Sequence, residues 1–214
     1  MKLLKTLAMG IALSAVTVMP GMAFDLEKDA AEWTANPDCV VTMYLGMPSS
    51  EFENNFSDIK GWKKTVFNNF NAYYPCHMTD YRRIETSSFN NKIATEERVG
   101  SIIREDTDSL EEANISLAYV KKTKNLNYKK DILPAMQNIK KIKGLIIDNM
   151  TKKYGPYTKI TNKHIAHAPN GQILGEYEDL EWDVGNEVYY VGYSIGSDPR
   201  SDMVGIVTFQ HRVK

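Results

Sequence analysis

Five acidic residues between positions 176 and 183 form the densest group of side chains in this chain that could do chemistry. They are Glu176, Glu178, Asp179, Glu181 and Asp183. Paired carboxylates can act as general acid and base or bind calcium. The segment reads as a β-strand, which directs successive side chains to opposite faces of a sheet. A spaced Asp/Asn loop with a bidentate glutamate is also missing. We therefore interpret the group as a solvated or charge-repelling strand.

His164 and His167 are the one close histidine pair in the sequence. On a helix both could reach one metal ion, but this segment is predicted to be a strand, which favours opposite faces. The sequence has no nucleophile-elbow context and no glycine-rich phosphate loop. We predict no metal site and no cofactor. An exported hydrolase that uses the carboxylates near Trp182 is kept as an alternative.

A basic segment separates the two halves of the chain. Residues 121–153 contain ten lysines against two aspartates, a local net charge of +8. Lys140, Lys141 and Lys143 are predicted to project from the outer face of a helix with no glutamate within one turn. Such a face can be merely solvated, or it can dock an anionic partner: a lipid headgroup, a polyanion or an acidic protein.

Tyrosines on predicted strands are a second candidate binding surface. Tyr189, Tyr190 and Tyr193 fall within one short stretch. A tyrosine on an exposed sheet face buries much area on binding at little entropic cost. Packing of these rings in a core is the alternative.

The first 23 residues are predicted to be a cleaved export signal. Lys2 and Lys5 precede an apolar run from Leu7 to Val18, and Gly21 and Ala23 place small residues before the expected cut. Cleavage would leave 191 residues (214 less 23) with a net charge of −3, in the periplasm or outside the cell. A retained N-terminal anchor is the alternative.

Export bears on the two cysteines, Cys39 and Cys76, which we expect to be joined. Closing this loop would stabilise the fold by about 4 kcal/mol in the chain-entropy model. Two isolated buried thiols are the other possibility. The spacing gives no CxxC, so neither a redox dithiol nor a zinc knuckle is indicated.

A long amphipathic helix is predicted from Asp131 to Gly155. Its apolar residues recur in steps of three and four, and Gly155-Pro156 ends it. The stripe comprises Ile132, Met136, Ile139, Ile142, Ile146 and Met150. This stripe needs a sheet to cover.

Strands are predicted on both sides of the long helix. Alternation and turn residues predict an antiparallel meander after it, with strands Lys159–His167, Ile173–Val184, Glu187–Ile195 and Met203–Val213. Before it, we expect short helices over 24–36 and 50–61 and four or five strands. Those strands are Trp62–Phe70, Tyr73–His77, Tyr81–Thr86, Arg98–Arg104 and Ile115–Val120.

The predicted fold class is α+β, with helices packed on antiparallel sheet. The halves resemble each other loosely, which allows two tandem helix-plus-meander units. The expected divisions are a signal peptide at 1–23, a first unit of helix and strands at 24–120, and a second unit at 121–214 with the basic helix and a four-stranded meander.

Two short stretches carry a resemblance to known proteins. Leu45-Gly46-Met47-Pro48-Ser49-Ser50-Glu51-Phe52 and Tyr154-Gly155-Pro156 resemble helix signatures of small exported α+β domains. Those domains include β-lactamase-inhibitory protein and the outer-membrane lipoproteins that assist β-barrel assembly. The resemblance implies a helical layer on an antiparallel sheet, in tandem in the inhibitor. No cysteine follows the apolar run, so the lipid anchor of the lipoproteins is missing.

These patterns favour an exported, non-enzymatic binding or inhibitory module. An envelope protein or an anionic surface is the expected partner. The charge balance does not indicate nucleic acid, and no second apolar stretch is long enough to span a bilayer. The exported hydrolase and an envelope structural protein are the alternatives.

Overall fold

A computed structural model describes residues 43–56, 63–67 and 78–214 of the chain. The predicted signal peptide at 1–23 lies outside these residues, and so do Cys39 and Cys76. The export and disulfide predictions therefore stay predictions.

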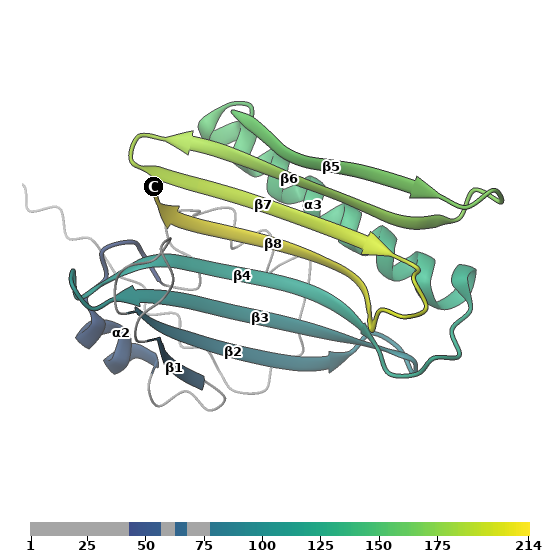
Figure 1. The fold of residues 1–214 in the computed structure, drawn as a ribbon, viewed down its shortest axis with the longest axis horizontal. Coiled ribbons are helices and arrows are strands. Elements are labelled where there is room, and N and C mark those ends of the chain that lie inside the picture. The colour runs from purple at the N-terminus through teal and green to yellow at the C-terminus, as the bar shows by residue number, and fades with distance from the viewer. Residues whose placement is uncertain (1–42, 57–62, 68–77) are drawn as a thin grey trace, which may run out of the picture.

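Eight antiparallel strands form one sheet in the described residues, in the order β1-β2-β3-β4-β8-β7-β6-β5 (Figure 1). The first four strands are a meander, and so are the last four. The two meanders meet where β4 pairs with β8, from Glu112 opposite Arg212 to Val120 opposite Met203. The strands are β1 (Lys63–Phe67), β2 (Met78–Ser88), β3 (Ile93–Arg104), β4 (Ser109–Lys121), β5 (Lys159–His167), β6 (Ile173–Val184), β7 (Glu187–Gly196) and β8 (Met203–Val213).

The α+β fold class expected from the sequence is wrong for this structure, because the sheet dominates it. Only two α-helices occur in the described residues: α2 (Ser49–Phe56) and α3 (Leu133–Tyr154). Strands β2, β3 and β4 are longer than their patterns indicate, and all eight strands join into a single sheet. The predicted strand Tyr73–His77 lies outside the described residues. Pairing of the last strands of the two meanders satisfies edge hydrogen bonds that separate units would leave open.

Local turn chemistry explains the second meander. Gly171 and Gly185 have φ of 77° and 59°, a region that glycine adopts without a steric penalty. Each lies in a tight turn between neighbouring strands, after Asn170 in the first turn and before Asn186 in the second. The observed bounds of β5, β6 and β8 are those that the alternation predicts.

Helix α3 follows a turn of π-helix, η1 (Tyr128–Ile132), whose N-cap Asn127 accepts a hydrogen bond from the N–H of Lys130. Pro134 falls in the first turn of α3, where its missing N–H removes no helical hydrogen bond. Gly155 ends the helix with φ of 81°. The predicted apolar stripe is buried along its whole length.

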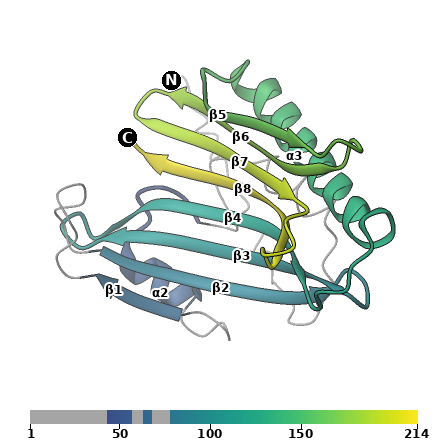
Figure 2. The same cartoon turned by 45° about the vertical axis from the view of Figure 1, so that its right-hand side comes forward.

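Both described helices pack on the same face of the sheet (Figure 2). Phe52 of α2 contacts the Tyr81 ring on β2, with centroids 4.7 Å apart. A row of directly paired residues on β3, β4 and β8 connects Tyr81 to Tyr189 on β7. The two tyrosines therefore lie on the same face of the sheet. Tyr189 in turn stacks on Tyr154 of α3, 4.8 Å between centroids. Directly opposed residues point to one side, so this register places α2 and α3 together.

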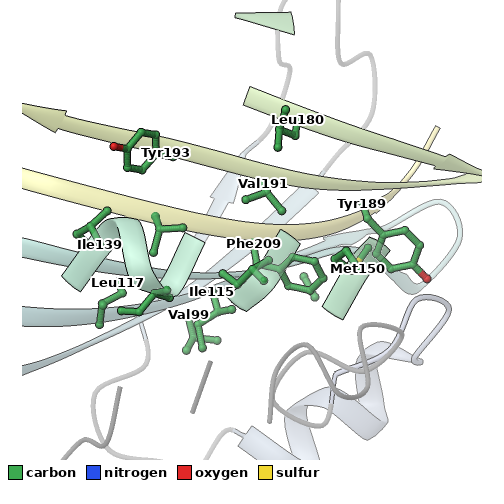
Figure 3. Close-up of a cluster of buried hydrophobic side chains, with 14 of the residues drawn as sticks. Val99, Ile115, Leu117, Ile139, Met150, Leu180, Tyr189, Val191, Tyr193 and Phe209 are labelled. Atoms are coloured by element: carbon green, nitrogen blue, oxygen red, sulfur yellow. The ribbon is translucent and has the colours of Figure 1, made fainter. Parts of the chain in front are cut away.

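The core lies between α3 and this helix-covered face (Figure 3). Ile139 and Met150 of α3 pack among side chains from β3, β4, β6, β7 and β8. The labelled members from the sheet are Val99, Ile115, Leu117, Leu180, Tyr189, Val191, Tyr193 and Phe209. Because these residues come from both meanders, one continuous core supports the whole sheet.

Candidate functional site

The basic residues of α3 meet acidic residues of β6. Lys140 Nζ lies 2.6 Å from Glu176 Oε2, and Lys143 pairs with Glu178. The expectation that these lysines have no acidic partner is therefore wrong. Their partners are about 35 residues away in sequence and reach them only through the fold. Lys141 is exposed on the helix.

Lys163 and the buried Tyr193 complete this group of charged and polar side chains. We call it the α3–β6 ion cluster (Lys140, Lys143, Lys163, Glu176, Glu178 and Tyr193). Lys163 Nζ on β5 lies 3.1 Å from Glu178 Oε1, whereas Lys143 pairs with Oε2 of the same carboxylate. Tyr193 donates its hydroxyl to Glu176 at 2.9 Å, and Lys143 Nζ stands 4.3 Å from the centroid of the same ring. The cluster therefore joins the helix to the sheet.

Electrostatics in the cluster favour the ionised carboxylates. Burial raises the pKa of Glu176 and Glu178, but hydrogen bonds from Lys140, Tyr193 and the two lysines at Glu178 lower it by more. The net pKa of both groups is below the usual glutamate value. Burial and the neighbouring carboxylates raise the pKa of Tyr193, so its hydroxyl stays a donor.

The three candidate tyrosines do not form one surface. Tyr189 and Tyr193 are 1% and 2% exposed and belong to the core. Tyr190 points to the opposite face, where its hydroxyl donates to Asp179 at 2.7 Å. Alternation along β7 produces this division. The predicted surface of three lysines and three tyrosines is therefore split between an ion cluster, the core and the far face of the sheet.

The carboxylates of β6 are likewise divided between two faces. Glu176 and Glu178 face α3, whereas Asp179 contacts Tyr190 on the other side. Glu181 lies 3.5 Å from Lys159, and Asp183 lies 3.4 Å from Lys214. The described residues contain no group of three histidine, cysteine or acidic side chains that could hold a metal ion. The five carboxylates that the sequence groups together therefore do not share one face of the sheet.

One surface was not identified from the sequence: the edge formed by β5, β6 and the turn before them. Of the eight large hydrophobic side chains exposed among the described residues, five lie here. Ile160 and Ile165 on β5 are 44% and 49% exposed. We call these residues the β5 edge patch, consisting of Tyr157, Ile160, Ile165, Leu174 and Tyr177. Ile160 and Ile165 pair with Leu180 and Glu176 on the α3 side of the sheet, whereas Tyr177 lies on the opposite side.

The patch borders an edge of the sheet. Among the described strands, β5 is last in the order and pairs on one side only, with β6. Register shifts at 160–162 and 166–167 bend this strand, and its lysines turn toward β6 carboxylates, leaving the isoleucines exposed. Tyr177 is stacked on His164, with centroids 5.4 Å apart. The sequence shows isoleucines in a strand, but which strand stands at the edge depends on topology.

Comparisons with protein-family models, with curated proteins and with solved structures find no match for this chain. In the part of the chain that the structure describes, neither α-helix has the length and hydropathy needed to cross a bilayer.

Proposed function

We propose that this chain is an exported, non-enzymatic binding module that docks a protein partner on the β5 edge patch. The observation that carries this proposal is the concentration of exposed apolar side chains on and beside β5, whose outer edge pairs with no other described strand. Large apolar side chains that gather, exposed, in one region of a surface often mark an interaction site. Edge strands offer main-chain donors and acceptors to an added strand, with side-chain pockets giving specificity.

The patch also suggests how a partner would bind. An extended segment laid along β5 would form main-chain hydrogen bonds and cover Ile160 and Ile165. Bulges and lysines on an edge strand limit indiscriminate pairing between sheets. Lys159 and Lys163 are held by Glu181 and Glu178, so they need not be displaced by the incoming segment.

The basic helix supports docking less well than the edge patch does. Two of its three candidate lysines are neutralised by β6 carboxylates, which reduces the positive field offered to an anion. We therefore place the partner at the sheet edge rather than on α3. An inhibitory role is the narrower form of the same proposal, in which the docked partner is an enzyme.

The proposal is tested by retention of envelope proteins on immobilised variants. Ile160→Asp and Ile165→Asp should each abolish capture of a partner that the parent protein retains, because a charge replaces the apolar contact. Ile84→Asp is the matched control, since Ile84 is 55% exposed on β2, away from this edge. Equal capture by Ile165→Asp and Ile84→Asp would show that the β5 edge patch is not the binding surface.

A further inference from the structure

A cleft of about 420 Å³ opens at one end of the sheet. Three segments form it: the connector after β4, the turn between β5 and β6, and the loop between β7 and β8. Figure 1 shows these segments together at the right-hand end of the molecule. The volume falls within the range of small-ligand sites, about 300–1,000 Å³. We call it the end cleft, and it is separate from the acidic residues of the ion cluster.

Hydrogen bonds between the three segments fix the walls of the end cleft. Ser197 donates its hydroxyl to the carbonyl of Ile173 at 2.7 Å and accepts from Gln172 Nε2 at 3.1 Å. The N–H of Ile173 donates to the hydroxyl of Tyr128 at 3.2 Å. Tyr128 begins the π-helical turn η1, a conformation that is frequent at functional sites. The cleft is therefore preformed by contacts among distant parts of the chain.

Lys121 is held in a fixed position at this cleft. Its ammonium donates to the main-chain carbonyls of Asp198 and Ser201, both at 2.7 Å. A lysine ammonium has three N–H groups, so one is left for another acceptor. Burial lowers the pKa of Lys121 more than the carboxylates of Asp198 and Asp202 raise it. The carbonyl oxygens orient the ammonium without cancelling its charge.

The lining carries a surplus of positive charge. Lys121, Lys122 and Lys124 face one lining carboxylate, Asp202, a local balance of +2. The ammonium of Lys122 donates to Ser88 Oγ and the Asn90 carbonyl, again uncharged acceptors. None of the three lysines forms an ion pair within the described ranges. An anion entering the cleft would therefore meet uncompensated charge on one wall.

Another part of the lining is apolar, formed by Leu126, Ile132 and the ring of Tyr128. Ligand sites combine such apolar walls with a few well-placed polar groups. We propose that the end cleft binds a small organic anion with a carboxylate at Lys121 and Lys124 and an apolar body against Leu126 and Ile132. This site is distinct from the β5 edge patch and does not depend on the proposed protein partner.

The test is a titration of the purified protein with hexanoate, followed by the amide signals of Gln172 and Ser197 in NMR spectra. Saturable shifts at both residues are expected with hexanoate. Acetate and inorganic phosphate should bind more weakly because they lack the apolar body, and 1-hexanol because it lacks the charge. Shifts equally large with 1-hexanol, or absent with hexanoate at tens of millimolar, would overturn the proposal.

Variants separate the role of the charge from a general effect on the fold. Lys124→Gln and Lys121→Met should each weaken hexanoate binding roughly tenfold, as expected for loss of a charge-assisted contact. The side chain of Lys124 is exposed and forms no ion pair with another described residue, so its variant stays informative if Lys121→Met unfolds. Lys129→Gln is the matched control, an exposed lysine on the same segment outside the cleft. The same affinity in Lys124→Gln and Lys129→Gln would contradict the proposal.

Discussion

At the residue scale, charge pairing across the fold decides what the lysines of α3 do. Lys143 and Glu178 have exposed side-chain fractions of 16% and 15%, so their pairing is shielded from solvent. The sequence places an uncompensated basic face here, because helical neighbours three and four residues away are not acidic. The acidic partners of these lysines lie on β6, in the sheet on which α3 packs. The spacing of residues along the sequence could not reveal this pairing, because the pairing requires α3 to lie against β6 at one particular position.

Glu178→Gln should destabilise the protein by about 1–3 kcal/mol at pH 7, because two lysines lose their carboxylate partner. Thermal melts would detect this as a fall of about 2–4 °C for each kcal/mol. Glu105→Gln is the control, since Glu105 is exposed in the turn after β3.

The difference between parent and Glu178→Gln should depend on pH. The pKa of Glu178 is lowered in the folded protein, so its stabilising effect is complete above its unfolded pKa of about 4.3. The effect is lost as pH falls through the lower folded pKa. The two melting curves should therefore converge below about pH 4. A gap between them that stays constant from pH 7 to pH 3 would show that ionisation of Glu178 does not stabilise the fold.

At the element scale, the contact between α3 and β8 depends on a glycine. A Cβ placed on Gly205 would lie 2.8 Å from Ile195 Cγ2, 3.2 Å from the carbonyl of Ser194 and 3.3 Å from Ile139 Cγ1. Ile195 and Ser194 belong to β7 and Ile139 to α3, so the added carbon would press on both the neighbouring strand and the helix. Periodicity predicts α3 itself well, but it cannot show which strand the helix approaches most closely.

Gly205→Ala should lower the free energy of unfolding by about 1–3 kcal/mol through overpacking. Gly175→Ala on β6 is the matched control, because a Cβ there meets no atom within 4 Å. Chemical denaturation of both variants gives the comparison. Equal midpoints for the two variants would mean that α3 does not pack on β8 as closely as the structure shows.

At the scale of the whole molecule, features set by residues close in sequence could be predicted, and features set by residues far apart in sequence could not. Strands β5, β6 and β8 were predicted within their observed bounds because alternation and Asn-Gly-type turns are local signals. The pairing of β4 with β8 was not predicted. These strands are about 90 residues apart in the sequence, and the alternation within each strand does not show which other strand it pairs with. That junction makes the fold one large sheet and leaves β5 at its edge.

The β5 edge patch is a consequence of this topology. In a closed sheet, the outer main-chain N–H and C=O groups of β5 would pair with a neighbouring strand. Here β5 is the terminal strand of the described sheet, and Ile160 and Ile165 on it are exposed. The candidate site could therefore not be recognised from the sequence, whereas the core residues on β7, such as Val191 and Ile195, could be.

Photo-crosslinking at the sheet edge is the sharpest test of whether a protein partner docks on the β5 edge patch. A photoreactive amino acid in place of Ile165, introduced in the cells that produce the protein, should give one discrete crosslinked species with a partner protein. The same amino acid in place of Ile84 on β2 should not give that species. Docking on the β5 edge patch is contradicted if position 165 yields no crosslink, or if positions 165 and 84 yield the same products.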